Sequence, residues 1–443
     1  MNKTLNPTIE ITDINSKGEG VARWQGKVCF VPQGVPGDLL EVRVVQQKKN
    51  YFTARIENII KPSSARGAPP PCKWFGICGG CSLQHIKYES QLEFKKQRLI
   101  SLLNKIAHFT TPLSLKVVAS PYKWFYRNKA QYNIEFKKGK IKIGFFQPHS
   151  HFLTPITKCM LQNTLNNFLL SAFYNIEKVF PQTGFQDNLK FLITKTNFSL
   201  SEALAVLVVK KEINLENLWF IKLSKMVPQL KGVIMNFSEG ESNVVLGSKS
   251  KLLWGKETIN EELEELKLYI GGDSFFQVNL AVVKLLWRDI AQEFKGGSFW
   301  IDAYCGVGTF SLLIAKRSAK VIAIEENGNA IKLAKASAFV NNINNLEFIQ
   351  GKVEEVLPKV FKNAIIDGIL LDPPRGGCRQ EVLSTISRNR PQKVIYISCN
   401  PATLARDMSF LLEAGYKVSF VQGYDFFPQT PHLEVAVEFV LND

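Results

Sequence analysis

The sequence has no long hydrophobic run. No segment approaches the roughly 18 consecutive apolar residues that a membrane-spanning helix needs, and the first residues, MNKTLNPTIEITD, lack the apolar core of a secretion signal. These absences exclude a protein built on membrane-spanning helices and predict a cytoplasmic one. Its eight cysteines are then reduced thiols, metal ligands or catalytic groups rather than disulfides. The 443 residues, 45% of them hydrophobic and 21% charged, suffice for two or three globular domains.

Acidic residues are scarce in the first third of the chain. Residues 1–150 contain 24 Lys and Arg but only 9 Asp and Glu, whereas the remainder is nearly neutral and the whole chain carries a net charge of +16. A basic part joined to a neutral part is typical of a polyanion-binding module attached to another activity, most simply nucleic acid and an enzyme. A basic surface that serves only solubility is the alternative.

Internal repeats and low-complexity tracts are also absent. The pattern of apolar and polar residues changes three times along the chain. Residues 1–62 show short alternating segments broken by Gly and Pro, which predicts a small antiparallel barrel or sandwich. The linker SSARGAPPPC follows, and then a helix over residues 90–107 with apolar positions at helical spacing: Leu92, Leu99, Leu102, Leu103 and Ile106.

Two further parts complete the chain. Residues from about 120 to 267 mix strand-like and helical runs, which favours an α+β domain. From residue 268 onward apolar strands alternate with helices. This pattern predicts an α/β domain with a doubly wound, largely parallel sheet that binds ligands at the carboxyl ends of its strands.

The first motif of this α/β part is FWIDAYCGVGTF, a strand followed by a glycine loop and a helix. The next strand ends in Glu325, where a carboxylate can accept hydrogen bonds from ribose hydroxyls. The loop lacks the third glycine of a dinucleotide fingerprint. S-adenosylmethionine therefore fits this nucleoside site better than NAD.

Three more polar groups follow strands of the same sheet. Asp372 lies in LLDPPR, where prolines make a rigid turn, and Cys399 lies in ISCNPATLARD, just before a helix that begins near Ala402. A thiol at a helix N-terminus is expected to have a lowered pKa and to be nucleophilic. Glu434, in HLEVAVEFV, is placed to act as a general base, although a solvent-facing strand residue is the ordinary alternative.

Three cysteines lie close together in PCKWFGICGGCS: Cys72, Cys78 and Cys81. With the distant Cys159 they form a candidate set of four thiolate ligands, which suits an iron–sulfur cluster or a structural zinc ion; the spacing favours iron–sulfur.

A basic and aromatic stretch, YKWFYRNKAQYNIEFKKGK, spans residues 122–140. Its aromatic faces could stack on unpaired bases while Arg127 and Lys129 bind phosphates, as single-stranded RNA requires. An ordinary amphipathic strand pair explains the local pattern equally well.

Taken in order, these motifs resemble those of RNA uridine-5-methyltransferases, specifically the subgroup that acts on 23S ribosomal RNA. The resemblance covers nearly the whole chain and rests on the cysteine loop, YRNKAQ, SFFQVN, DAYCGVGTF, LDPPRGGC, ISCNPATLARD and HLE. It implies three domains: a TRAM RNA-binding β-barrel, OB-like, over residues 1–62; a middle α+β domain over 63–267, whose helix 90–107 packs on the catalytic domain; and a Rossmann-like S-adenosylmethionine-dependent methyltransferase domain over 268–443.

The same resemblance assigns roles to individual residues. Cys399 would be the nucleophile that adds to carbon 6 of the uracil, and Glu434 the base that removes the carbon-5 proton. The methyl-donor pocket would be lined by Gln277, Tyr304, Thr309, Glu325 and Asp372, and a [4Fe-4S] cluster would be held by Cys72, Cys78, Cys81 and Cys159. The expected partner is 23S rRNA, with no membrane and no protein partner, for an enzyme that is monomeric. The same reaction on tRNA and a noncatalytic RNA-binding iron–sulfur protein are the alternatives.

Departures from the family pattern concern four positions. Thr309 stands where relatives often have Asn, and Lys352 where they commonly have Asp or Asn near the adenine. Cys305 and Cys378 lie within the motifs but not at a nucleophile's position, and we expect both to be packing residues.

Overall fold

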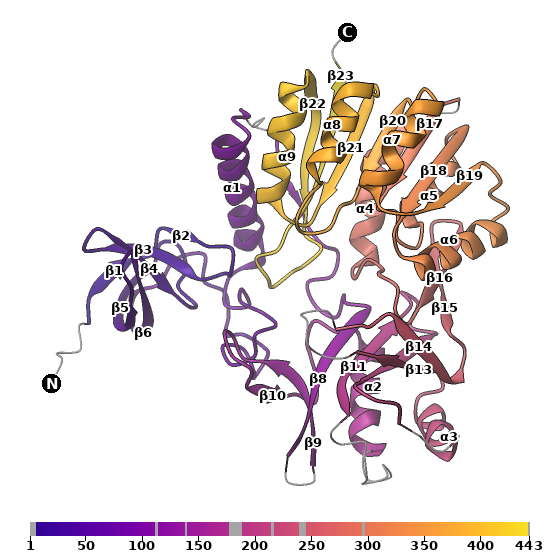
Figure 1. Cartoon of the computed structure of the whole chain (residues 1–443). Helices are drawn as coiled ribbons and strands as arrows, with labels where there is room; N and C mark the ends of the chain where they lie inside the picture. Colours follow the sequence, from indigo (N-terminus) through magenta and orange to yellow (C-terminus); the bar gives the residue numbers. More distant parts are fainter. Residues whose placement is uncertain are drawn as a thin grey trace.

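The structure is a computed structural model that describes residues 6–110, 114–137, 140–176, 188–213, 217–238, 245–294 and 297–441. Its described part contains three large sheets, arranged as an N-terminal barrel, a middle layer and a C-terminal layer (Figure 1). No helix in these ranges is long and apolar enough to cross a membrane.

The first sheet has six strands in the order β1-β5-β6-β4-β3-β2. Its strands are β1 (Thr8–Glu10), β2 (Asp13–Ile14), β3 (Gly20–Trp24), β4 (Lys27–Val31), β5 (Leu39–Gln47) and β6 (Tyr51–Lys61). Alternating apolar residues such as Val31, Leu40 and Phe52 fill its interior. The expectation of a wholly antiparallel barrel was wrong at one pair: β6 follows β4 after a single intervening strand, so the two run parallel.

The middle sheet has seven strands in the order β10-β9-β8-β11-β12-β13-β14. They are β8 (Lys129–Lys137), β9 (Lys140–Phe146), β10 (Leu153–Pro155), β11 (Leu189–Thr196), β12 (Ala203–Val209), β13 (Leu230–Phe237) and β14 (Lys249–Gly255). One face packs under α2 (Thr164–Ile176) and α3 (Asn217–Met226). Every residue of β12 is buried, because Ala205 and Leu207 belong to that core while Leu204 and Val206 belong to the core of the C-terminal layer, which carries the α/β part of the chain.

The C-terminal sheet has eight strands in the order β19-β18-β17-β20-β21-β23-β22-β7. They are β7 (Val117–Val118), β17 (Phe299–Ala303), β18 (Lys320–Glu325), β19 (Leu346–Gln350), β20 (Gly368–Leu371), β21 (Lys393–Ser398), β22 (Tyr416–Tyr424) and β23 (Glu434–Leu441). Strands β17 to β21 pair in parallel and β23 runs antiparallel to β21 and β22. A hairpin, β15 (Thr258–Leu263) and β16 (Leu266–Gly271), precedes this layer.

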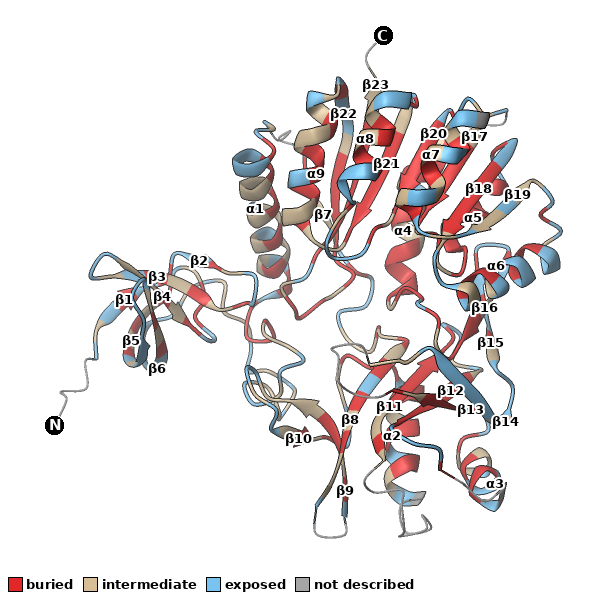
Figure 2. Ribbon diagram, viewed as in Figure 1, coloured by how far each residue is buried: buried red, intermediate tan, exposed pale blue. Residues whose placement is uncertain are grey.

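Helices cover both faces of the C-terminal sheet, and buried residues follow its strands (Figure 2). One face carries α4 (Leu280–Ile290), its 3-10 extension η2 (Ala291–Glu293), α5 (Thr309–Ala315) and α6 (Gly328–Val340). The other carries α7 (Val353–Asn363), α8 (Gln380–Asn389), α9 (Pro401–Glu413) and α1 (Tyr88–Ile106). The predicted doubly wound architecture is therefore present.

Helix α1 lies beside α9, although it precedes the middle sheet in the chain (Figure 1). Leu99 and Leu103 are buried as the helical spacing predicts, but Ile106 is exposed, and Gln91 and Lys95 are buried in place of further apolar residues. The apolar pattern could not reveal this, because each of the two polar side chains has a side-chain partner more than 300 residues away.

Candidate active site

A cleft of about 1520 Å³ opens at the carboxyl ends of the parallel strands, between the catalytic and middle layers. Eight of the residues singled out in the sequence line it: Arg127, Lys129, Gln277, Tyr304, Glu325, Asp372, Cys399 and Glu434. Thr309 lines a small adjoining hollow that it shares with Gln277, Tyr304 and Asp372. The structure thus brings the predicted catalytic, cofactor-binding and RNA-binding residues to one place, while the four predicted metal ligands lie elsewhere.

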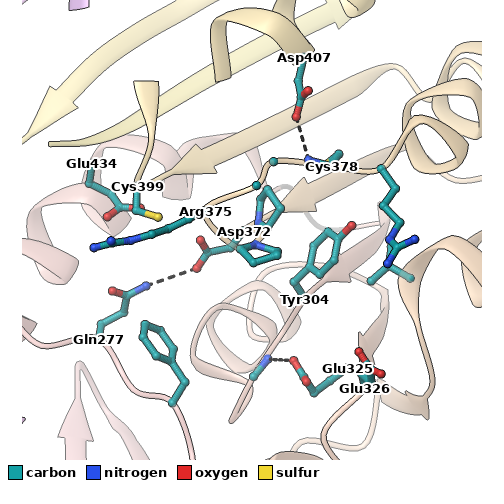
Figure 3. A pocket seen from close by; sticks show the side chains of 18 of the residues that line it. Gln277, Tyr304, Glu325, Glu326, Asp372, Arg375, Cys378, Cys399, Asp407 and Glu434 are labelled. Atoms are coloured by element: carbon teal, nitrogen blue, oxygen red, sulfur yellow. Dashed lines mark hydrogen bonds between the residues drawn. The ribbon is translucent and has the colours of Figure 1, made fainter. Parts of the chain in front are cut away.

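Cys399 follows β21 directly and is placed by the turn that begins α9. The side chain of Asn400 caps the helix by accepting a hydrogen bond from the Ala402 amide (3.3 Å), and Pro401 occupies the first turn, where a missing N–H is tolerated. The amide of Asn400 also donates to the Ser398 hydroxyl (3.1 Å). The partly exposed thiol consequently points into the cleft, near Glu434 (Figure 3).

The predicted lowering of the Cys399 pKa was wrong. Burial raises the pKa of the thiol to about 11, and the nearby carboxyl groups of Glu434 and Asp372 raise it further, whereas Arg375 acts in the opposite direction. The field of the α9 N-terminus does not outweigh these effects. The resting thiol is therefore protonated at neutral pH.

The two carboxyl groups of the cleft, Asp372 and Glu434, are also shifted toward their protonated forms. Although part of Asp372 faces the open cleft, desolvation raises its pKa to about 7, opposed by a hydrogen bond from Gln277 Nε2 (3.3 Å). Glu434 is buried, and desolvation followed by the charge of Asp372 raises its pKa well above the ordinary range. Its burial excludes the alternative of a solvent-facing strand residue.

Arg375 is a residue to which the sequence assigned no role. Its charge opposes the pKa increases of both Cys399 and Glu434, and Figure 3 shows its side chain extending beside these two groups. The available signal was its position as the one cation of the DPPR turn. It provides positive charge where a thiolate and a carboxylate must coexist.

The glycine loop after β17 has the conformation that its sequence requires. Tyr304, Gly306 and Gly308 all have positive φ angles, of 67°, 56° and 80°. The amide of Gly306 donates to Glu325 Oε2 (3.0 Å), so the loop and the end of β18 are joined in front of the cleft. The Glu325 carboxylate remains partly exposed there, as a group that binds ribose hydroxyls must be.

The turn that carries Asp372 and Arg375 is held in place by hydrogen bonds to helix α9 and its N-cap. The buried Asp407 accepts hydrogen bonds from the Cys378 amide (2.8 Å) and the Tyr396 hydroxyl (2.6 Å), and Asn400 Nδ2 donates to the Arg375 carbonyl (3.0 Å). Asp407 closes the motif ISCNPATLARD but received no role from the sequence. These hydrogen bonds tie the turn that carries Asp372 to the strand end that carries Cys399, and Cys378 is buried between them.

Arg127 and Lys129 lie at the start of β8 and face the cleft. Arg127 lies over the Phe427 ring (5.8 Å), and its Nε atom is buried without a hydrogen-bond partner. Two aromatic side chains of the same stretch behave differently: Tyr126 and Tyr132 are buried in the protein and cannot stack on bases. The stacking interpretation was therefore wrong for these two tyrosines.

The four candidate metal ligands come from two segments. Among the residues that the structure describes, no group of three or more His, Cys, Asp or Glu side chains has an arrangement that could hold a metal ion. Burial raises the pKa of both Cys78 and Cys81, and the charges of Cys159 and Cys72 add smaller increases to both. The Gly80 amide donates to Cys78 Sγ (3.4 Å).

The fold and the cleft together define a class. A doubly wound sheet with a glycine loop, an acid at the end of the next strand and an N-terminal barrel is the architecture of an S-adenosylmethionine-dependent methyltransferase with a TRAM domain. The sequence model described as tRNA (Uracil-5-)-methyltransferase matches residues 87–441, and the TRAM domain model matches residues 7–56. The chain belongs to this methyltransferase family.

Relatives extend over the whole chain. A Listeria monocytogenes protein named an uncharacterized RNA methyltransferase is 35% identical over 99% of this chain and 98% of its own length. A protein of the same description from Synechocystis is 38% identical over 97% and 94%. The crystal structure of Pyrococcus abyssi tRNA (uracil-54, C5)-methyltransferase in complex with S-adenosyl-L-homocysteine has a TM-score of 0.77 and 26% identity, covering 98% of this chain and all of that one.

Proposed function

We propose that this protein transfers a methyl group to carbon 5 of a uridine in 23S rRNA through a covalent adduct with Cys399. The observation that carries the reaction is the convergence of Cys399, Glu434 and Asp372 on one cleft beside the glycine loop. S-adenosylmethionine supplies an electrophilic methyl group on a positively charged sulfur.

The chemistry requires a nucleophile because carbon 5 of uracil is itself too weak to attack a methyl group. The Cys399 thiol loses its proton to solvent in the cleft, the resulting thiolate bonds to carbon 6, and the electron pair of the 5,6 double bond passes into an enolate. Carbon 5 then bonds to the methyl carbon as the methyl–sulfur bond breaks. Glu434 removes the carbon-5 proton, the double bond forms again, and the carbon–sulfur bond to Cys399 breaks.

The electrostatics of the cleft suit this sequence of events. The raised pKa of Asp372, about 7, allows this carboxyl group to exchange a proton with the cleft at neutral pH. The pKa of Glu434 is raised as well, so Glu434 must lose its own proton before it can act as the base. Arg375 stabilises the thiolate and the enolate once they form. Binding of a cationic methyl donor would favour the ionised carboxylates.

Gln277, Tyr304, Thr309, Glu325 and Asp372 are proposed to hold the methyl donor. Support comes from their positions around the cleft and its adjoining hollow, and from the hydrogen bond between Glu325 and the glycine loop. Arg127 and Lys129 are proposed to bind phosphates of the RNA. They line the same cleft, and no ion pair within the described ranges includes either of them.

Cys72, Cys78, Cys81 and Cys159 are proposed to hold a [4Fe-4S] cluster. The influence of Cys72 and Cys159 on the pKa values of Cys78 and Cys81, and the amide hydrogen bond to Cys78 Sγ, support four thiolate ligands with a backbone donor. Anaerobic purification should yield a brown protein with about four irons per chain. A colourless protein with stoichiometric zinc would refute the cluster.

Three domains are proposed at residues 1–62, 63–267 and 268–443. The strand ranges of the three sheets support the division, although α1 and β7 pack with the catalytic layer. We propose a monomer without protein partners, which light scattering of the purified chain would test.

A tRNA target is the second candidate, and a specific observation favours it. The Pyrococcus enzyme acts on tRNA according to its name, yet it aligns with 98% of this chain, which includes regions equivalent to the barrel and the cysteine loop. These two features therefore do not separate rRNA from tRNA substrates. Mapping 5-methyluridine in rRNA and tRNA from a deletion strain decides between the two: loss from 23S rRNA alone supports the first target, and loss from tRNA alone refutes it.

Tritium release from RNA labelled at carbon 5 of uridine tests the reaction itself. The wild-type chain should release tritium only with S-adenosylmethionine present, and Cys399→Ala should release none. Cys29→Ala, which removes a thiol from the barrel core, is the matched control and should retain activity. RNA containing 5-fluorouridine should trap a covalent complex with the wild-type protein, because Glu434 cannot remove fluorine from carbon 5. Release by Cys399→Ala would refute the adduct mechanism.

A further inference from the structure

Lys195 is a fully enclosed lysine near the end of β11. Its side chain is 3% exposed. Burial lowers the pKa of its ammonium group well below the ordinary value, and the neighbouring Lys129 lowers it further, against a smaller opposing effect of Asp273. None of the ion pairs in the described part of the chain includes Lys195. A buried amine without a carboxylate is unfavourable unless other polar atoms satisfy its hydrogens.

Two backbone carbonyls provide that compensation. Lys195 Nζ donates to the Gly271 carbonyl at 2.6 Å and to the Ser274 carbonyl at 2.5 Å. The Ser274 hydroxyl bonds both the amide and the carbonyl of Gly271 (3.1 Å each), so residues 271–274 form a closed turn around the ammonium group. This turn directly follows β16 and begins the segment that carries SFFQVN.

The same segment places Gln277 in the cleft. The side chain of Gln277 donates from Nε2 to Asp372. The backbone carbonyl of Gln277 accepts from Asn128 Nδ2 (2.9 Å), and the backbone amide of Asn128 donates to the Val278 carbonyl (3.1 Å). Lys195 on β11 and Asn128 just before β8 therefore hold the segment from two sides of Gln277. Both belong to the middle layer, although Gln277 serves the catalytic one.

We propose that Lys195 is a positioning residue, which fixes the Gln277 side chain against Asp372 by binding the two carbonyls at the start of the segment. The inference rests on the proposed role of Gln277 in the methyl-donor pocket. It gives the middle layer a function in methyl-donor binding that is separate from RNA contact. A packing role alone would not require an amine at this position.

Affinity for S-adenosylhomocysteine, measured by calorimetry on the full chain without RNA, tests the proposal. Lys195→Met should weaken binding about tenfold and leave RNA affinity within twofold. Lys267→Met, which removes an exposed lysine from β16, should change neither. In a Gln277→Ala background, Lys195→Met should cause no further loss, because the lysine acts through that glutamine.

Several outcomes would overturn the inference. They are wild-type affinity in Lys195→Met, an equal loss in Lys267→Met, and an undiminished loss in the Gln277→Ala background. If Lys195→Met does not fold, Lys195→Arg replaces it. The guanidinium keeps donors for both carbonyls, so this variant should bind S-adenosylhomocysteine with an affinity within threefold of wild type. A tenfold loss of affinity in Lys195→Arg counts against the proposal. The measurement needs no methylation of uridine, so failure of the proposed reaction would appear separately, as absent tritium release by the wild type.

Discussion

The ion pair between Lys95 of α1 and Asp425, just after β22, offers a quantitative test of the structure. Its atoms lie 2.6 Å apart, and the two side chains are 3% and 0% exposed. Lys95 Nζ also donates to the Phe427 carbonyl (3.2 Å). Removing one partner leaves the other charge buried and unpaired, so Lys95→Met should lower the free energy of unfolding by about 3–5 kcal/mol.

Two further variants distinguish an ion pair from ordinary packing. Lys95→Met combined with Asp425→Leu removes both charges and should lose much less than the sum of the single variants. Asp425→Asn should show a distinctive pH dependence. Burial already lowers the Lys95 pKa, and loss of the carboxylate removes the opposing attraction. Lys95 then binds its proton more readily in the unfolded chain than in the folded chain. The loss of unfolding free energy in Asp425→Asn is therefore largest at low pH and becomes smaller as pH rises toward the ordinary lysine pKa.

Urea unfolding followed by circular dichroism measures these differences. Lys96→Met is the matched control, since Lys96 is more exposed and its pairing with Glu93 at 4.0 Å should contribute less than about 1 kcal/mol. The reasoning is refuted if Lys95→Met loses no more than Lys96→Met, or if the double variant loses the full sum.

Three other predictions concern the cleft. Asp407→Ala removes the acceptor for the Cys378 amide, and a resulting shift of the turn by about 1 Å should lower kcat, measured by tritium release, about 100-fold. An unchanged kcat would show that Asp407 does not hold the turn in place. Tritium release should rise with pH between about 6 and 8, because the raised pKa of Asp372, about 7, delays its ionisation. A flat wild-type profile contradicts this, as does an unchanged rise in Asp372→Asn. Arg127→Gln and Lys129→Gln should each reduce the slope of log affinity against log salt for single-stranded RNA by about 0.7, and an unchanged slope excludes a phosphate contact.

The sequence predicted those features whose causes are local. Glycine and proline mark the turns at strand ends, and parallel strands carry those ends to one edge of the sheet. Asp372 and Cys399 could consequently be assigned to one cleft from the sequence alone.

Features that depend on distant partners could not be predicted. Gln91 is buried with Gln429 as one of its hydrogen-bond partners, and Lys95 is buried because Asp425 neutralises it; spacing in the sequence reveals neither of these partners. The predicted shift of the Cys399 pKa was wrong for the same reason. The direction of the shift is decided by burial and by carboxyl groups from other strands, not by the helix that follows Cys399. A local motif identifies a reactive group, whereas its ionisation belongs to the assembled cleft.

Strand β12 has a consequence for how substrate reaches that cleft. Because both of its faces are buried, rotating the middle layer away from the catalytic layer would expose apolar surface at about 25 cal/mol per Å². Burial of both faces of β12 therefore opposes a hinge motion that separates the two walls of the cleft. A uridine that enters the cleft must itself leave its stack, so part of the conformational work of the reaction falls on the RNA.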